Sequence, residues 1–421
     1  MEHILRTIKK IIPEKFFRAV VPAYHFILSF FAALFYRFPS RHIFIIGVTG
    51  TKGKTTVVEL INAMCEEAGY KTAISNSLRF KVGVESYNNT FKMTMPGRFF
   101  LQSFLRKAIR ENCSHAILEM TSEGAKQHRH RFISLNALVF TNLAPEHIES
   151  HGSYENYRDA KLEIAHSLER SRKKRKFIVV NADDAEADKF LNVRIKEKYS
   201  YSLKDALPYE LKKRGMFLTF ENTRIETCFS GLFNIYNILA AAVSAKHISI
   251  GGETIKSALQ KCKGIPGRME YIDEGQDFTV IVDYAHTPDS LQKVYEVFHE
   301  SNKICVLGAA GGGRDEWKRE VLGSIANTHC STIILTNEDP YDENPLEIVY
   351  NIQKGITEPI FKIVIDRREA IRHALKEAKT GDVVIITGKG SELFIMGPSG
   401  VKIPWSDAGV VREELKKILE K

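Results

Sequence analysis

Short apolar runs alternate with amphipathic stretches along most of the chain, and glycine-rich turns separate them. The run Ile43–Val48 has the length of one buried strand, and the stretch Thr55–Ala68 after it predicts a helix that ends at Gly69. Further apolar runs predict buried strands at 116–118, 137–140, 177–180, 280–282, 304–307, 332–335 and 383–387. Because strands alternate with helical patterns, the sequence predicts an α/β fold built on mostly parallel sheets.

Two folded domains and a short leading segment are expected, because 421 residues are too many for one ordinary core. The stretch Gly264–Gly267 contains two glycines and a proline, which makes it the best candidate for a hinge. We therefore predict a hydrophobic N-terminal helical segment at 1–41, a central α/β domain at 42–265 and a second α/β domain at 266–421.

The leading segment contains a long uncharged stretch. Ala19–Tyr36 has no Asp, Glu, Lys or Arg, which makes it a borderline membrane span by length, although Pro22 and His25 weaken that interpretation. Basic residues flank it on both sides, so the charge rule gives no orientation. Three interpretations stay open: a helix packed on the folded body, an interfacial amphipathic anchor, and a true span.

Composition narrows the class of protein. The chain is 44% hydrophobic and 26% charged, as in soluble globular proteins, and its six cysteines lack metal-binding spacing, which favours reduced thiols in a cytosolic protein. The formal net charge of +9 favours an anionic ligand such as a nucleotide, a phosphorylated sugar or a membrane surface. The basic run 170–176 lacks interleaved aromatic residues, so we interpret it as a solvated helix end and expect no nucleic-acid partner.

The loop between the first predicted strand and helix has the composition of a phosphate-binding loop. Its small residues allow close backbone approach, its N–H groups form an anion cradle, Lys54 adds a positive charge and Thr55 offers a hydroxyl to Mg²⁺. The glycine spacing departs from the P-loop pattern and resembles the G-T-x-G-K-T-[ST] loop of Mur ligases. That resemblance implies an ATP site formed by Gly50, Thr51, Lys52, Gly53, Lys54, Thr55 and Thr56, with Lys54 catalytic.

Two histidines and two carboxylates lie close together at Glu146–His151, where the residues alone leave a metal site and a polar loop both open. The stretch resembles the Mur-ligase pattern T-N-[LI]-x-x-D-H-x-D-x-H-G, which a lysine carbamylated by CO₂ follows in that family. The resemblance implies that His147 is a catalytic metal ligand and that Lys161 is the carbamylated catalytic lysine that helps hold Mg²⁺. Both family aspartates are glutamates here, Glu146 and Glu149.

A third cluster carries Glu119 at the end of a predicted strand, where a carboxylate facing a phosphate loop is well placed to bind Mg²⁺ in a catalytic role. The sequence around it resembles the family patterns E-x-S-S-H-[GA]…Q-x-R and T-T-P. These patterns imply a site for a muramyl-peptide acceptor formed by Thr94, Ser122, Gln127 and Arg129. Glu123 replaces the family histidine and Met95 replaces the second threonine, so an exposed surface loop stays open as the alternative at both positions.

Three further motifs concern the nucleotide. Asn234 and Asn237 fall on one helical face, so their amides can reach an adenine edge, with a helix N-cap as the alternative for Asn234. This segment and the stretches P-G-R-M-E and D-Y-A-H-T-P resemble Mur-ligase motifs, in which the arginine meets phosphate and the aspartate meets ribose. The resemblance implies that Asn234, Asn237, Arg268 and Asp283 bind the nucleotide.

Among Mur ligases the pattern is closest to the UDP-N-acetylmuramyl-tripeptide synthetases, which add the third residue of the stem peptide. The resemblance implies an amino-acid pocket formed by Arg319, Glu338, Asp339, Tyr341, Gly388 and Glu392. Members that add meso-diaminopimelate carry D-N-P-R where this chain has E-D-P-Y, so the arginine partner of a distal carboxylate is missing. We therefore predict an amino acid other than meso-diaminopimelate, with lysine as the leading candidate.

The resemblance extends from Ile46 to the C-terminal region and implies a P-loop-type ATPase domain followed by a Rossmann-like domain, without the family's usual N-terminal UDP-binding domain. It implies a cytoplasmic ligase that uses ATP, Mg²⁺ and an acyl phosphate to join a free amino acid to a UDP- or lipid-linked muramyl peptide. Peripheral contact with the inner face of the membrane through the N-terminal segment is a further hypothesis. Two alternatives stay open: another Mur-fold ligase of the folylpolyglutamate or cyanophycin type, and a non-catalytic nucleotide-dependent binding protein at the membrane.

Overall fold

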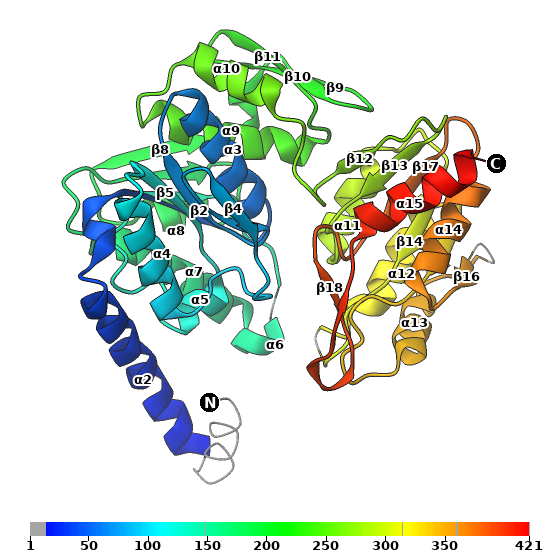
Figure 1. Cartoon of the computed structure of the whole chain (residues 1–421), viewed down its shortest axis with the longest axis horizontal. Coiled ribbons are helices and arrows are strands. Elements are labelled where there is room, and N and C mark those ends of the chain that lie inside the picture. The colour runs from blue at the N-terminus through cyan, green and yellow to red at the C-terminus, as the bar shows by residue number, and fades with distance from the viewer. Residues whose placement is uncertain (1–13, 147, 314, 359–360, 421) are drawn as a thin grey trace.

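Two α/β bodies lie side by side in the computed structural model, which describes residues 14–146, 148–313, 315–358 and 361–420 (Figure 1). The first body, which we call the middle body, is built on an eight-stranded sheet, and the C-terminal body is built on a six-stranded sheet. The fold class predicted from the sequence is therefore confirmed.

The sheet of the middle body has the order β4-β3-β2-β5-β1-β6-β7-β8. Neighbouring strands from β2 to β8 are parallel, and β3 and β4 form an antiparallel edge. The strands are β1 (Phe44–Thr49), β2 (Thr72–Ser75), β3 (Arg79–Val82), β4 (Glu85–Asn88), β5 (His115–Glu119), β6 (Ala137–Phe140), β7 (Phe177–Asn181) and β8 (Glu197–Tyr201). Parallel pairing brings the carboxyl ends of β2, β5, β1 and β6 to one edge, where ligands bind in such sheets.

Helices cover both faces of this sheet because alternate strand residues are apolar on either side. Ile46 and Val48 of β1 face α3 (Lys54–Glu67) and α9 (Leu232–Lys246), whereas Ile45 faces the opposite layer. That opposite layer contains α4 (Arg98–Arg110), α5 (Ser122–Lys126), α7 (Tyr154–Glu169) and α8 (Ala187–Leu191). Outside α3 and α9 lie α10 (Gly252–Lys261), η2 (Leu203–Ala206) and a small antiparallel sheet of β9 (Glu210–Leu211), β10 (Met216–Phe220) and β11 (Thr223–Thr227).

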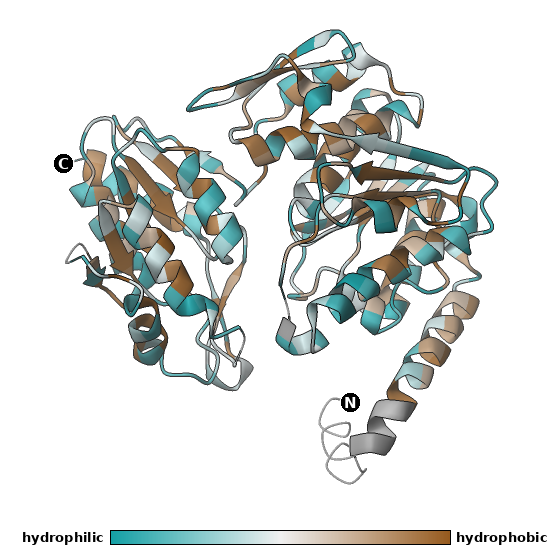
Figure 2. Cartoon of the chain, turned by 180° about the vertical axis from the view of Figure 1, so that it is seen from behind, coloured by the Kyte–Doolittle hydropathy of each residue, from teal (hydrophilic) through white to brown (hydrophobic). Residues whose placement is uncertain are grey.

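The sheet of the C-terminal body has the order β12-β13-β17-β14-β15-β16, and all neighbours are parallel except β12 and β13. Its strands form an apolar layer between helices (Figure 2). The strands are β12 (Glu270–Ile272), β13 (Thr279–Val282), β14 (Lys303–Leu307), β15 (Thr332–Leu335), β16 (Phe361–Ile363) and β17 (Val383–Ile386). One face packs on α11 (Pro288–Glu296), α12 (Lys318–His329) and α13 (Pro345–Gln353), and the other on α14 (Arg367–Glu377) and α15 (Asp407–Leu419). A hairpin of β18 (Phe394–Met396) and β19 (Lys402–Pro404), with η3 (Pro398–Gly400) at its turn, completes the body.

One expectation about the cysteines is wrong. Cys305 of β14 and Cys330, two residues before β15, form a disulfide, with their Cα atoms 6.2 Å apart. The other four cysteines are free thiols, as expected. The two bonded residues are 25 positions apart in the chain, so their closeness comes from the parallel pairing of β14 and β15 rather than from any local spacing.

The N-terminal helix α2 (Glu14–Phe35) lies on the outside of the middle body, and its first turns extend beyond that body (Figure 1). Its C-terminal half packs inward, because Ala32 and Ala33 are fully buried and the Ser29 hydroxyl donates to the carbonyl of His128 at 2.9 Å. The interpretation as a helix packed on the folded body is confirmed for this half. No helix within the described ranges combines the length and the apolar content needed to cross a membrane, so the interpretation as a true span is wrong.

Candidate active site

The phosphate loop lies between β1 and α3, at the edge of the sheet where the parallel strands end. Gly50 (φ +145°) and Gly53 (φ +82°) adopt backbone conformations that other residues rarely take. A Cβ atom at Gly50 would lie 2.0 Å from Thr141 Oγ1, and one at Gly53 would lie 2.1 Å from Asn237 Oδ1. Glycine therefore lets the loop lie close against its neighbours with the N-terminus of α3 behind it, an arrangement that fits a phosphate group.

Two lysines, a half-buried one and a buried one, reach this loop from different helices. Lys54 Nζ, at the start of α3, donates to the carbonyl of Thr51 at 2.8 Å, and Lys161 Nζ, on α7, donates to the carbonyl of Gly50 at 2.6 Å. Burial lowers the pKa of both ammonium groups, and the charge of Lys54 helps to hold the pKa of Lys161 well below its ordinary value. The loop thus has two lysine nitrogens at the position where a triphosphate would lie.

The Glu119 carboxylate connects the phosphate loop to a second segment. Its Oε2 accepts hydrogen bonds from the Thr55 hydroxyl and from the backbone N–H of Ser77, both at 2.9 Å. The Ser77 hydroxyl lies 3.2 Å from the same carboxylate and 2.8 Å from the Thr94 hydroxyl. Carboxylate and hydroxyl oxygens are preferred ligands of Mg²⁺, so Glu119 and Thr55 fit the ion that accompanies a nucleotide.

No group of three or more His, Cys, Asp or Glu side chains is arranged to hold a metal ion in the part of the chain that the structure describes. This is compatible with Mg²⁺, which usually takes one or two carboxylates and completes its coordination with phosphate oxygens and water. His147 lies outside the described residues, so its role as a metal ligand stays a prediction.

The acidic residues next to His147 contact other groups. Glu146 Oε1 accepts from Lys52 Nζ at 2.8 Å and lies 3.4 Å from Nε2 of His286, which belongs to the C-terminal body. Glu149 Oε2 accepts at 2.6 Å from the backbone N–H of Asp315, which lies in the C-terminal body between β14 and α12. Both glutamates that replace the family aspartates therefore bridge the two bodies.

The predicted acceptor-binding residues after β5 form one hydrogen-bonded group. Arg129 donates to Gln127 Oε1 at 2.6 Å and, with its other terminal nitrogen, to the carbonyl of Met95, which follows Thr94 in the chain. Ser122 is buried at the start of α5. Met95 is 3% exposed, so the exposed-loop alternative is wrong at that position, whereas Glu123 is exposed.

The two asparagines proposed from the sequence for the adenine edge are buried beside the phosphate loop. Asn237 Nδ2 donates to Asn234 Oδ1 at 2.9 Å, and Asn234 Nδ2 donates to the carbonyl of Ser230 at 2.8 Å. Asn237 is also the side chain that leaves no room for a Cβ atom at Gly53. The pair therefore positions the phosphate loop, and its contact with adenine stays a prediction.

Asp283 has both carboxylate oxygens engaged by the backbone. Its Oδ2 accepts from the N–H of Met269 and its Oδ1 from the N–H of Ala285, each at 2.7 Å. Burial raises the pKa of this carboxyl group. The Arg268 guanidinium lies 4.3 Å from the centroid of the Tyr284 ring. Asp283 thus connects the backbone at Met269 to the backbone at Ala285. Its contact with ribose stays a prediction.

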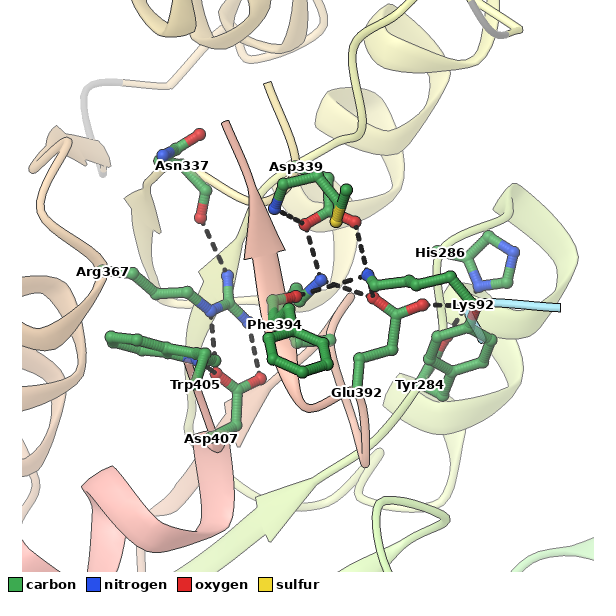
Figure 3. A network of polar contacts seen from close by, with 12 residues as sticks. Lys92, Tyr284, His286, Asn337, Asp339, Arg367, Glu392, Phe394, Trp405 and Asp407 are labelled. Atoms are coloured by element: carbon green, nitrogen blue, oxygen red, sulfur yellow. Dashed lines mark hydrogen bonds and ion pairs between the residues drawn. The ribbon is translucent and has the colours of Figure 1, made fainter. Parts of the chain in front are cut away.

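A network of carboxylates and ammonium groups forms the predicted amino-acid pocket (Figure 3). Lys389 Nζ donates to Asp339 Oδ1 at 2.6 Å and also to Glu392. Lys92, which comes from the middle body, donates to Glu392 Oε2 at 2.7 Å and to Asp339 Oδ2 at 3.1 Å. Burial acts to raise the pKa of Asp339, but Lys389 and Lys92 hold it below its usual value. Two ammonium groups of the chain itself thus pair with the two carboxylates, and the binding of an amino acid here stays a prediction.

The remaining pocket residues line the same region. Glu338 is buried, which raises the pKa of its carboxyl group, and its Oε2 would lie 2.3 Å from a Cβ atom at Gly388. Tyr341 adopts a left-handed conformation (φ +53°). Arg319 is 2% exposed and donates to Glu343 Oε2 at 2.7 Å, so an acidic partner from the chain itself neutralises its charge.

Comparison with known proteins shows the family to which the chain is related. The model of the Mur ligase middle domain matches residues 48–245, and that of the Mur ligase glutamate ligase domain matches residues 267–390. A UDP-N-acetylmuramoyl-L-alanyl-D-glutamate–2,6-diaminopimelate ligase of Syntrophomonas wolfei is 36% identical over 404 residues, which cover 92% of this chain and 81% of that protein. The chain belongs to the Mur ligase family.

Other relatives of this Mur ligase support the same conclusion. A UDP-N-acetylmuramyl-tripeptide synthetase of Borreliella burgdorferi is 33% identical over 414 residues, which cover 92% of this chain and 79% of that protein. A solved structure of a 2,6-diaminopimelate ligase superimposes with a TM-score of 0.62 at 28% identity, covering 90% of this chain and 79% of that chain. A folylpolyglutamate synthase of Mycobacterium tuberculosis, at 15% identity and a TM-score of 0.70 over 92% of both chains, shares the fold.

Two residues of the site were not predicted from the sequence of this Mur ligase. Ser77 lies two residues after the end of β2, at the edge where the phosphate loop lies, and a prediction of β2 as a parallel strand would have pointed to it. Lys92 carries no local signal, because its partners Asp339 and Glu392 belong to the other body.

Proposed function

We propose that this Mur ligase uses ATP to add an amino acid to a UDP-linked muramyl dipeptide in peptidoglycan synthesis, as the names of its relatives describe. The position of Glu119 is the observation that carries the proposal. Its carboxylate contacts Thr55 of the phosphate loop and, through Ser77, the predicted acceptor residue Thr94. The γ-phosphate of ATP and the carboxylate of the acceptor would therefore meet at one place.

The reaction proceeds in two displacements. The acceptor carboxylate attacks the γ-phosphorus and the bond to the ADP oxygen breaks, then the amine attacks the acyl carbon, phosphate leaves and the amine gives up a proton. Glu119 and Thr55 would hold Mg²⁺, which would neutralise charge on the phosphate oxygens. Lys54 stabilises the transferred phosphoryl group and Arg129 orients the acceptor carboxylate. Catalysis is then mostly positioning and electrostatics.

The boundary between the two bodies is proposed near residue 265. The other residues predicted from the sequence are assigned to two binding roles and to the metal site. Nucleotide binding is assigned to Gly50, Thr51, Lys52, Gly53, Thr56, Asn234, Asn237, Arg268 and Asp283. Acceptor and amino-acid binding are assigned to Ser122, Gln127, Arg319, Glu338, Asp339, Tyr341, Gly388 and Glu392. His147 is assigned to the metal site with Lys161.

Lys161 is the residue that we expect to carry a carbamate. CO₂ adds to the neutral amine and a proton leaves, so an anion replaces the ammonium group. The side chain is 2% exposed, close to the positive charge of Lys54 and against the carbonyl of Gly50. An anion there would pair with Lys54 and help hold Mg²⁺. It would also remove the cost of keeping a buried positive charge on Lys161 next to that of Lys54.

Phosphate release is expected to require both the acceptor and an amino acid, with L-lysine preferred over meso-diaminopimelate by at least about tenfold in kcat/KM. Asp339 and Glu392 favour a cation, whereas Tyr341 offers no charge to a distal carboxylate and Arg319 is paired with Glu343. An amino-acid screen with the full chain, ATP and UDP-muramyl dipeptide measures this preference.

The variant Tyr341→Arg is the matched comparison for the screen, because it restores the charge at that position and should move the preference towards meso-diaminopimelate. Preference of the unaltered protein for meso-diaminopimelate would show that the lysine hypothesis is wrong. Phosphate release at the same rate with and without the acceptor would instead contradict the ligase function itself.

We also propose that α2 contacts the membrane surface that carries lipid-linked muramyl peptides, which would place this cytoplasmic ligase at the inner face. The helix α2 is rich in apolar residues (Figure 2), and several of its exposed ones lie three or four positions apart, so they form an apolar stripe on one helical face. The stripe consists of Val20, Tyr24, Ile27, Phe31 and Leu34, each 45–54% exposed. Confinement to that surface raises the effective concentration of a lipid-linked acceptor.

Replacing Ile27 and Phe31 by serine is expected to remove most binding to anionic vesicles, because each buried apolar side chain contributes roughly 1.5–3 kcal/mol. Co-sedimentation with phosphatidylglycerol vesicles measures the bound fraction. The matched control is Leu211→Ser with Val401→Ser, which removes two exposed apolar residues elsewhere. If the unaltered protein stays in the supernatant, the membrane proposal is wrong.

A further inference from the structure

The ammonium group of Lys92 is surrounded by three acceptors of the C-terminal body. Its Nζ lies 2.7 Å from Glu392 Oε2, 3.1 Å from Asp339 Oδ2 and 3.3 Å from the carbonyl oxygen of Phe394 (Figure 3). The Lys92 side chain is 19% exposed and that of Asp339 is 7% exposed. Burial acts to lower the pKa of Lys92, but the two carboxylates raise it above its ordinary value, so the group stays charged. This is a nearly buried ion cluster rather than a surface salt bridge.

The charges in this cluster are balanced only while Lys92 is present. Asp339 and Glu392 supply two negative charges, and Lys389 and Lys92 supply two positive charges. When Lys92 leaves, two carboxylates share one ammonium group. The cluster then has room and charge for one further cation.

The protonation state that the reaction requires indicates which group of the substrate could replace Lys92 beside the two carboxylates. The amine that attacks the acyl phosphate has to be neutral when it attacks, so two carboxylates cannot hold it as an ammonium ion. A cation of the substrate that stays bound during the reaction must therefore belong to its side chain. Because the group that it would replace is the primary ammonium of Lys92, a second amino group fits this place best. The amino acids with that property are diamino acids, in which one nitrogen reacts and the other remains charged.

We propose that Lys92 is an internal substitute for the second ammonium group of a diamino acid, and that the substrate displaces it from Asp339 and Glu392. The inference rests on the proposed function, because it takes these two carboxylates as part of the amino-acid pocket. Lys92 competes from within the same chain, so it lowers the apparent affinity for every substrate that must displace it. An amino acid with an uncharged side chain cannot replace it without leaving the carboxylates underpaired, and is rejected.

The segment that carries Lys92 also contacts the residues around Glu119, where the acceptor is predicted to bind. Thr94, two positions further along, contacts Ser77, which contacts Glu119. Release of Lys92 by the incoming amino acid therefore acts on the segment that holds the acceptor, and Lys92 is a positioning and specificity residue rather than a catalytic one.

The variant Lys92→Met tests the proposal, because it removes the ammonium group and keeps a side chain of similar length. The KM for L-lysine is expected to fall by at least about tenfold, with the KM for ATP unchanged. Lys92→Arg keeps the charge and should retain the KM of the unaltered protein. The matched control is Lys402→Met, since Lys402 Nζ donates at 3.3 Å to a backbone carbonyl in the same loop, that of Thr90.

Calorimetric titration of L-lysine into the full chain gives a second readout that needs no turnover. Lys92→Met should bind L-lysine about tenfold more tightly, because the ligand no longer has to displace a competing ammonium group. Unchanged or weaker L-lysine binding by Lys92→Met overturns the inference, even if the protein is an active ligase. Absence of phosphate release from the unaltered protein with every amino acid and acceptor overturns the proposed function instead.

Discussion

Replacement of Lys54 by alanine is expected to reduce ATP turnover by at least about 1,000-fold, because the variant loses the cation that stabilises the transferred phosphoryl group. Lys54 begins α3 directly behind the phosphate loop, and its ammonium group donates to the carbonyl of Thr51 within that loop. Phosphate release with saturating acceptor and amino acid measures the loss. Lys107→Ala is a suitable control, because that exposed lysine pairs with Glu85 away from the loop.

A Lys54→Ala variant that keeps turnover within tenfold of the unaltered protein would show that another cation serves the phosphate. Circular dichroism of both variants separates this result from a loss of folding, since the α3 helix should persist with alanine at its first position.

Replacement of Lys161 by alanine is expected to reduce turnover by about 100-fold or more, because the carbamate that would pair with Lys54 and Mg²⁺ can no longer form. A high concentration of a small anion such as chloride should restore part of the activity of Lys161→Ala. The same anion should not rescue Lys54→Ala, in which a cation is missing.

Carbon-13 NMR of the protein in labelled bicarbonate provides a readout independent of activity. A carbamate resonance should be present in the unaltered protein and absent from Lys161→Ala. Full activity of Lys161→Ala would remove the carbamate hypothesis, and a resonance that persists in this variant would assign the modification to another lysine.

Continuous apolar runs were sufficient to predict the strands at the centre of both sheets. The run that became β1 has five of its six residues fully or nearly buried, so hydrophobicity alone identifies it. The edge strand β4, by contrast, is exposed throughout, and the short strand β9 is exposed as well. Such strands form because a neighbour offers free backbone groups, and their own sequences carry no apolar signal.

The candidate site was predictable where its residues are neighbours in the chain. Gly50, Gly53 and Lys54 fall in one loop, so their spacing alone indicated a phosphate site. The contact of Glu146 with His286 and the partners of Lys92 were not predictable, because His286, Asp339 and Glu392 lie on the C-terminal body and these contacts depend on how the two bodies meet. For Lys161 the family motif named the residue, and the structure adds its contact with the carbonyl of Gly50.

The tight fit around Gly50 and Gly53 also limits how this protein can change under selection. Neither position has room for one added methyl group, because a Cβ atom would overlap Thr141 or Asn237, and both residues have positive φ angles. An inhibitor whose affinity came from the backbone of this loop would meet few viable resistance mutations there. Escape would have to arise at side chains around the loop, where substitutions are easier to accommodate and easier to anticipate.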